Sequence, residues 1–196
     1  MTDDGAGAAY ITRMKHSLFG LILLFGCGDG DSTASEQTPP MGHDAIEAWL
    51  ASAPSNYKTW AAETTVHPSR DPSPHGFNRI YSNDIIAANA SSTGPWPKGA
   101  AAVKELYASM TATTPIGIAV YLKLEADSAG GANWYWYERV PLDHDAPHDA
   151  KGVVADGRGD SGPAKAICVG CHAGAGVDAM HTPTPGGRDQ VYTPVR

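Results

Sequence analysis

Cys168, Cys171 and His172 are the residues of this chain whose types and spacing indicate a specific chemistry. They belong to the run Cys168-Val169-Gly170-Cys171-His172, close to the C-terminus. A Cys-x-x-Cys-His run is the attachment site of a c-type haem, to which both thiols bond covalently. The imidazole of the adjacent histidine can then bind the iron as an axial ligand. The sequence therefore predicts one covalent haem c, held by Cys168 and Cys171, with His172 on the iron.

Two other uses of a Cys-x-x-Cys pair fit the surrounding sequence less well. A redox disulfide of the thioredoxin type follows a strand and opens a helix, whereas this pair follows a glycine-rich stretch at residues 157–163. A structural zinc site needs about four ligands, commonly from two such pairs, and the chain has only one further cysteine, Cys27. A haem-less surface binding module, in which the two cysteines form a disulfide, is kept as the third hypothesis for function.

Cys27 ends a short apolar stretch that follows a basic segment. Such a stretch is typical of a signal peptide, and it is shorter than the roughly 20 residues that a membrane-spanning helix needs. Residues 24–27 resemble a bacterial lipobox, although Phe25 departs from its usual small residue. We predict that residues 1–26 are a lipoprotein signal peptide and that Cys27 carries the lipid. An ordinary signal peptide that leaves Cys27 as a free thiol is the alternative.

The first residues contain Asp3 and Asp4, which are unusual in the basic part of a signal peptide. Initiation at Met14 gives a cleaner pattern, because Lys15 then follows directly. We therefore expect translation to start at Met14. Export agrees with the haem prediction, because covalent haem attachment takes place outside the cytoplasm, where the thiols are kept reduced until they react. We expect a periplasmic or outer-membrane lipoprotein that meets the membrane through its lipid anchor only.

The composition limits the partners and the fold. The chain carries 21 acidic and 14 basic residues, which gives a formal net charge of −7. Proteins that bind nucleic acid present basic faces, so we expect no nucleic acid and instead a small-molecule ligand or a redox partner protein. The 22 glycines and 15 prolines favour many turns over a bundle of long helices.

The polar, small residues at 27–40 predict a flexible linker, and we place the haem domain at residues 41–196. Asp44 and Glu47 have the spacing of a capping box at the start of a helix. Apolar residues at helical spacing follow, namely Ile46, Trp49, Leu50 and Ala53. Pro54 ends this helix, and we expect Tyr57 and Trp60 to extend its apolar face.

Beyond Trp60 the apolar residues alternate with polar ones, which predicts strands. We expect strands at residues 77–81, 100–106, 116–125 and 133–140. The alternation within 116–125 predicts one buried face, and within 133–140 the tryptophans share one face and the tyrosines the other.

A short helix is expected through residues 85–90, capped by Asn83 or Asp84, and residues 141–166 read as a long loop. The fold class that follows is α+β. It is mainly an antiparallel sheet, with a few short helices packing against it and the single haem lying on the sheet.

Several runs in this order resemble the cytochrome P460 family, which includes the β-sheet cytochromes c′. They are Ser73-Pro74-His75-Gly76, Arg79-Ile80-Tyr81-Ser82-Asn83, Trp96-Pro97-Lys98-Gly99 with Val103-Lys104-Glu105-Leu106, Trp134-Tyr135-Trp136-Tyr137-Glu138 and the terminal Cys168–His172. The resemblance covers about residues 67–196. It implies a largely antiparallel sheet, a single c-type haem, a proximal ligand at His172 and a distal side open to small ligands.

One departure from the family concerns a lysine. Family members that oxidise hydroxylamine carry a lysine cross-linked to the haem, in the stretch between the turns that match Asn83 and Trp96. Here residues 90–94 of that stretch contain no lysine. Lys98 and Lys104 lie nearby, and we predict that both point away from the haem. The family's scaffold is then expected without its hydroxylamine chemistry, which leaves open whether the chain is an enzyme.

The residue on the distal side of the iron separates two functions. Histidine or methionine there makes a six-coordinate electron carrier, whereas an open face binds or redox-processes small nitrogen ligands such as nitric oxide or hydroxylamine. The conceivable ligands are Met110, Met180, His181, His67 and His75. We interpret His75 as a turn residue that bonds to the backbone, and we take the open face as the first hypothesis.

Three further residues are candidate haem contacts. Trp134 and Trp136 lie on one face of their strand, which would wall the haem pocket; packing in the sheet is the alternative. Arg79 alternates with large apolar residues, so we expect it to pair with Glu138 or with a haem propionate. A surface position of Arg79 is the alternative.

Overall fold

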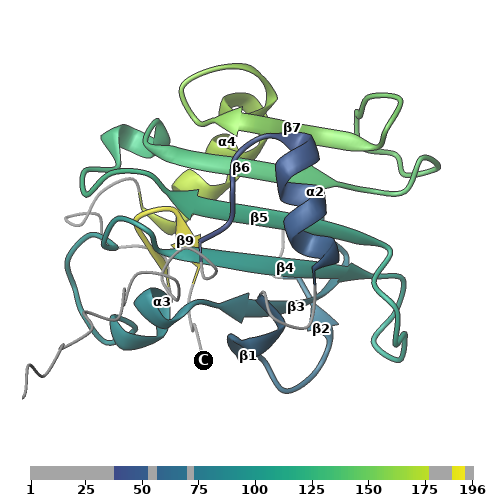
Figure 1. Ribbon diagram of the computed structural model, residues 1–196, viewed down its shortest axis with the longest axis horizontal. Helices are drawn as coiled ribbons and strands as arrows, with labels where there is room; N and C mark the ends of the chain where they lie inside the picture. Colours follow the sequence, from purple (N-terminus) through teal and green to yellow (C-terminus); the bar gives the residue numbers. More distant parts are fainter. Residues whose placement is uncertain (1–37, 53–56, 70–72, 177–186, 193–196) are drawn as a thin grey trace, which may run out of the picture. The chain divides into compact units, whose positions relative to one another are not determined.

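An antiparallel sheet forms the centre of the part of the chain that the structure describes (Figure 1). The computed structural model describes residues 38–52, 57–69, 73–176 and 187–192. In this part of the chain seven strands belong to the sheet, in the order β1-β3-β4-β5-β6-β7, and β2 also pairs with β3. The predicted class, an α+β fold dominated by an antiparallel sheet, is confirmed.

The described residues form two sheets and several short helical elements. Its strands are β1 (Ala61–Ala62), β2 (His67–Pro68), β3 (Phe77–Ser82), β4 (Ala101–Tyr107), β5 (Gly117–Lys123), β6 (Trp134–Arg139) and β7 (Val153–Arg158). A second, two-stranded sheet consists of β8 (Gly187–Arg188) and β9 (Val191–Tyr192). The helical elements are α2 (His43–Ala51), η1 (Tyr57–Thr59), α3 (Asp84–Ala88), η2 (Ala129–Gly131), η3 (Ala164–Val169), α4 (Gly170–His172) and η4 (Ala173–Ala175).

All four predicted strands are present, as β3 to β6, because their alternating residues suit a pleated backbone. The prediction of a single buried face for β5 is wrong. Lys123, on the face expected to meet water, is only 1 % exposed. β5 is a central strand and is covered on both faces, as strands of an enclosed sheet are.

α2 covers one face of the sheet and lies in front of it in Figure 1. Ile46 of α2 joins Tyr57, Trp60, Tyr135 and Tyr137 in one apolar cluster, so the predicted extension of the helical face is confirmed. Burial of apolar surface of this kind contributes roughly 25 cal/mol per Å².

The predicted capping box is wrong. The N-cap of α2 is Gly42, without a side-chain cap, and Asp44 lies in the first turn. Glu47 accepts hydrogen bonds from Tyr137 Oη and, at 2.8 Å, from Arg139 Nε. The tertiary contact with β6 therefore replaces the local bond that the spacing predicts, because Glu47 has charged and hydroxyl donors within reach.

The opposite face of the sheet is covered by segments from the second half of the chain and by α3. Its apolar cluster contains Ile86, Trp96, Trp134, Trp136, Ala155, Ala164, Cys168, Val169 and Val191. Asn83 caps α3 as predicted, since its Oδ1 accepts from Ile86 N at 3.1 Å.

The predicted loop at residues 141–166 is wrong in its second half. It contains β7, which pairs with β6 at the edge of the sheet, and the start of η3. An edge strand has a short apolar part and exposed residues, so its sequence resembles a loop. Among the residues that the structure describes, every helix is too short or too polar to cross a bilayer.

Candidate haem-binding site

A pocket lies on the face of the sheet opposite α2, between strands β4 to β6 and the helical segment that carries the Cys-x-x-Cys-His run. Its empty volume, which includes space open to solvent, is about 480 Å³. Its walls include Pro74, His75, Lys104, Ala119, Tyr121, Trp136, Glu138, Ile167, Cys168, Cys171 and His172.

The helical segment η3–α4 brings the two thiols to this pocket. Cys168 is buried and Cys171 is half-buried, and both are free thiols. Positions three apart share one side of a helix, so both sulfurs face the pocket. Cys168 lies in a π-helical turn, a geometry that is frequent at functional sites.

Three observations weigh against the other uses of this cysteine pair. Burial raises the pKa of the Cys168 thiol to about 12, so it is protonated at neutral pH and unlike the acidic thiol of a disulfide oxidoreductase. The two sulfurs form no disulfide with each other. Within the described ranges, no cluster of three or more histidines, cysteines, aspartates or glutamates is arranged to hold a metal ion.

His172 has the protonation and orientation of a metal ligand. Its Nδ1 donates to the carbonyl oxygen of Gln190 at 2.7 Å. Because a carbonyl only accepts, Nδ1 must carry the hydrogen, which leaves a lone pair on Nε2. Burial, together with the positive charge of Lys104, lowers the pKa of His172 to about 3. The imidazole is therefore neutral, as an axial ligand must be.

Aromatic rings surround the His172 imidazole. The ring centroid of Trp136 lies 4.6 Å away, that of Tyr192 5.7 Å and that of Tyr121 6.1 Å. The register of the sheet places Tyr121 directly beside Trp136. These residues form an apolar wall that suits the flat, apolar body of a porphyrin.

A second group of pocket residues is polar. Lys104, Ala119 and Glu138 lie in one row across β4, β5 and β6. The outer two are separated by two strand spacings, about 10 Å, and the small Ala119 between them leaves space. His75 reaches Glu138 from the turn before β3, with its Nδ1 3.1 Å from Glu138 Oε1.

The prediction that Lys104 points away from the haem is wrong. Lys104 lines the pocket together with Cys171 and His172. Burial lowers its pKa, which increases the fraction of neutral amine. The alternation of β4 predicts that Lys104 and the core residue Val103 point to opposite faces of the sheet. Alternation alone does not say that a pocket covers the face on which Lys104 lies.

The interpretation of His75 as a turn residue bonding to the backbone is also wrong for its side chain. The imidazole lines the pocket, and its side chain is only 10 % exposed. Burial and the charge of Lys104 lower its pKa, so His75 is neutral at pH 7. Its Nδ1 makes no hydrogen bond of good geometry.

The remaining candidate ligands lie elsewhere. Met110 is 58 % exposed, and His67 bonds to Glu63 Oε2 at 2.9 Å. Met180 and His181 lie outside the described residues, as does the predicted lipidation site Cys27.

The structure brings only one of the three further predicted contacts into the pocket. Trp136 lines it, whereas Trp134 is fully buried beside it and donates from Nε1 to Ser128 Oγ at 3.1 Å. Arg79 donates to the carbonyl oxygen of Glu63 at 2.7 Å. It pairs with neither Glu138 nor any other pocket residue, because it points to the same face as Tyr81, over whose ring its guanidinium lies at 5.1 Å.

The described residues fit a c-type haem: two reduced thiols, a neutral imidazole with a free Nε2, and an aromatic wall around one pocket. A family model described as Cytochrome P460 matches residues 54–193. No curated protein sequence matches the chain. The matched range contains every strand of the large sheet and every residue that lines the pocket.

Proposed function

Because the chain belongs to the cytochrome P460 family, and is thus a c-type haem protein, we propose that its distal haem face binds or redox-processes small nitrogen ligands of the nitric oxide and hydroxylamine class. In this proposal one haem is attached covalently through Cys168 and Cys171, and His172 is the axial ligand. The observation that carries the proposal is the pocket in which these three residues face three ionisable side chains, His75, Lys104 and Glu138.

The haem would supply an iron that binds small ligands and exchanges electrons. The protein's own groups supply the rest. A nitrogen compound that is oxidised also loses protons, and Glu138 and His75 are positioned in the pocket to accept them. Lys104 can donate hydrogen bonds to a polar ligand, and the wall of Trp136 and Tyr121 excludes water from one side.

The position of Lys104 bears on the enzyme question. The family's hydroxylamine-oxidising members carry a lysine cross-linked to the haem, and we propose Lys104 as the residue of this chain that can take that place. Its lowered pKa increases the fraction of amine that is unprotonated and nucleophilic. Mass spectrometry of haem-containing tryptic fragments tests this. A fragment that joins Lys104 to the Cys168–Cys171 peptide supports the cross-link, and separate peptides contradict it.

The experiment for haem attachment and ligand binding uses purified mature protein. We expect an added haem mass, haem staining after denaturing electrophoresis, and a high-spin reduced spectrum that shifts when nitric oxide is added. Cys168→Ala and Cys171→Ala should each weaken attachment, and His172→Ala should change the spectrum while the stain remains. Wild-type protein whose mass shows no added haem would support the haem-less module instead.

A six-coordinate electron carrier is the second candidate, and His75 is the observation that favours it. The Nδ1 atom of His75 faces the Glu138 carboxylate, as in carboxylate–histidine pairs behind metal ligands, where Nε2 binds the metal. A low-spin spectrum that does not respond to nitric oxide would support this candidate. His75→Ala should then convert it to a high-spin, responsive spectrum.

We further propose that the protein is exported and held at a membrane surface by lipid on Cys27, with a redox partner protein or a small molecule as its partner. The short apolar stretch that ends at Cys27 supports this. Metabolic labelling with palmitate tests it. Label in the wild type, and release of Cys27→Ala from the membrane fraction, are the expected results. An unlabelled protein that stays soluble would contradict the anchor.

A further inference from the structure

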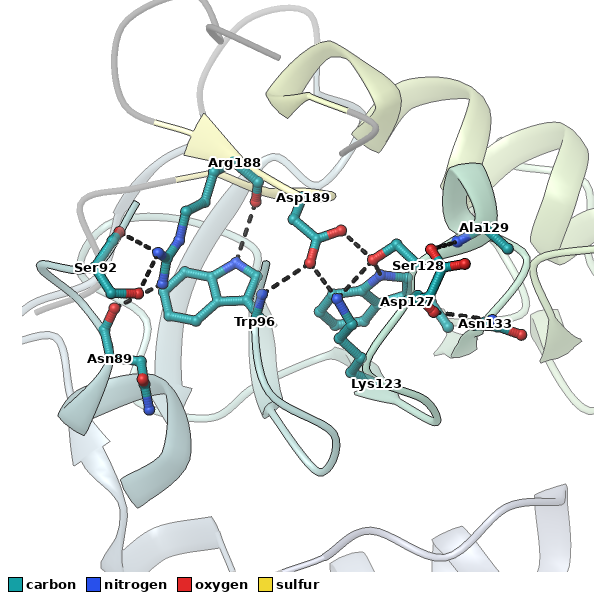
Figure 2. Close-up of polar contacts among 11 residues, drawn as sticks. Asn89, Ser92, Trp96, Lys123, Asp127, Ser128, Ala129, Asn133, Arg188 and Asp189 are labelled. Carbon is teal, nitrogen blue, oxygen red and sulfur yellow. Dashed lines mark hydrogen bonds and ion pairs between the residues drawn. The ribbon is translucent and has the colours of Figure 1, made fainter. Parts of the chain in front are cut away.

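A buried ion pair lies behind the proximal side of the site. Lys123 of β5 pairs with Asp189, in the turn between β8 and β9, and both side chains are 0 % exposed (Figure 2). Ser128 links them, because its Oγ accepts from Lys123 Nζ at 2.7 Å and donates to Asp189 Oδ1. Asp189 Oδ2 also accepts from Trp96 N at 2.9 Å.

Burying two charges is costly, and apolar residues of similar volume often stabilise a fold as well or better. A fully satisfied buried pair is best attested as a device that specifies one arrangement of the chain. The arrangement specified here is the β8–β9 turn. Its anchor, Asp189, lies 66 residues from Lys123 in the sequence.

The β8–β9 turn has a backbone that needs such support. Its two central residues, Asp189 and Gln190, have φ values of 47° and 70°. A two-residue hairpin turn with positive φ at both positions normally uses Asn-Gly or Asp-Gly, and glutamine in this region is disfavoured by its Cβ. Gln190 N donates to the carbonyl of Gly176 at 2.8 Å, which adds a second anchor.

The neighbouring residue Arg188 is anchored as well. Its guanidinium lies 3.6 Å from the ring centroid of Trp96 and donates to Ser92 Oγ and the Asn89 carbonyl, both at 2.6 Å (Figure 2). Trp96 Nε1 donates back to the carbonyl of Arg188 at 3.1 Å. The turn is therefore held from both sides.

The turn ends in the carbonyl that meets the axial histidine, since Gln190 O accepts from His172 Nδ1 at 2.7 Å. We propose that Lys123, Asp189 and Ser128 are positioning residues that hold this carbonyl against His172 and thereby set the tautomer, the ring orientation and the donor strength of the imidazole. A hydrogen bond of this kind raises the basicity of a metal-bound histidine. The inference rests on the proposed function, because it assigns His172 to the iron.

The test uses the haem-loaded protein and two spectroscopic readouts. Asp189→Asn keeps a side chain that tolerates left-handed backbone but loses the ion pair with Lys123. We expect haem to stay attached, the iron–histidine stretching band in the resonance Raman spectrum to move to lower frequency, and the midpoint potential to rise. Lys123→Met should shift both in the same direction, and Ser128→Ala, which keeps the ion pair, should shift them less.

Lys98→Ala is the matched control, because Lys98 forms an exposed ion pair with Glu125 at 3.3 Å. This substitution should leave the iron–histidine band and the midpoint potential unchanged. A folded Asp189→Asn protein with the wild-type band and potential would overturn the proposal and leave the cluster a purely structural one. If both charge variants fail to fold, Ser128→Ala decides by the same readouts.

A wild-type chain without haem would contradict the proposed function rather than this inference. Nitrogen NMR of the haem-free protein would then test the positioning directly. Hydrogen on Nδ1 of His172 in the wild type, with a mixture of tautomers in Asp189→Asn, is the expected result. The same tautomer in both proteins would overturn it.

Discussion

Lys104 and Glu105 are neighbours on β4, yet their side chains lie in two different kinds of environment. Glu105 points to the α2 face, where it is fully buried and accepts from Tyr57 Oη at 2.8 Å, from Tyr107 Oη at 2.7 Å and from Lys58 Nζ. Lys104 points to the pocket face, which it lines together with Glu138, Cys171 and His172.

The difference shows which buried polar groups are structural and which are available for chemistry. Every donor around Glu105 is used, and the cluster joins η1 to the sheet. On the pocket face, His75 Nδ1 makes no hydrogen bond of good geometry, although buried polar atoms are almost always bonded. Unused polar capacity around a pocket that carries Cys171 and His172 is what a ligand site requires.

The pKa values follow the same division. Burial alone would raise the pKa of Glu105, but hydrogen bonds from Lys58, Tyr107 and Tyr57 outweigh it and lower the pKa. On the pocket face burial dominates instead, and it lowers the pKa of Lys104 and of His75. The α2 face therefore stabilises its charge, whereas burial on the pocket face disfavours the charged forms of Lys104 and His75.

Removing the carboxylate on the α2 face should have the largest effect on stability. In Glu105→Ala the hydroxyls of Tyr57 and Tyr107 lose their acceptor and Lys58 loses its counter-ion, so we expect the free energy of unfolding to fall by about 3 kcal/mol. Urea denaturation measures it. The haem spectrum of the folded fraction should stay as in the wild type; a changed spectrum with unchanged stability would reverse the roles of the two faces.

The matching change on the pocket face should act on chemistry instead. Glu138→Gln keeps the shape of the side chain but removes a proton acceptor, so we expect the rate of hydroxylamine oxidation to fall about 100-fold, with less than about 1 kcal/mol lost in stability. Steady-state kinetics and urea denaturation of the same preparation measure both. An unaffected rate in a well-folded variant would remove Glu138 from the proposed chemistry.

Acid should separate the two faces further. Because the pKa of Glu105 is lower in the folded chain than its ordinary value of 4.5, the unfolded chain binds more protons near and below that pH. Its contribution to stability is therefore present above pH 4.5 and is lost as the pH falls through the folded pKa. We expect Glu105→Gln to flatten the acid limb of a stability–pH curve relative to the wild type. Parallel curves for the two proteins would contradict this.

The smallest effect is expected at the surface. Lys98 and Glu125 form an ion pair at 3.3 Å with side chains 65 % and 55 % exposed. Exposed pairs contribute roughly 0–1 kcal/mol, so Lys98→Ala should change the free energy of unfolding by less than about 0.5 kcal/mol. A larger loss in thermal denaturation would mean that burial does not decide how much each charged cluster contributes to stability.

Local sequence determined much of the fold. The alternation in β3 to β6 depends only on the pleat of an extended backbone, and the cap of α3 by Asn83 depends on a bond three residues long. The spacing of Cys168, Cys171 and His172 is equally local, because it follows from one helical turn. The family was visible in the same runs of residues.

Tertiary structure decided what covers each face. Lys104 and Lys123 both alternate with apolar residues, as exposed lysines do, yet one lines a pocket and the other is buried against Asp189. His75 and Gln190 meet their partners Glu138 and His172 only through the packing of distant segments.

The physical reason is the range of the interactions. Alternation specifies that a strand has two faces. Whether a face meets water, a core or a pocket depends on the segments that fold over it. For Lys123 that segment contains Asp189, 66 residues further along the chain. Periodicity depends on a few neighbouring residues of the sequence. The burial of a charge depends on whether a distant segment places a partner of opposite charge beside it.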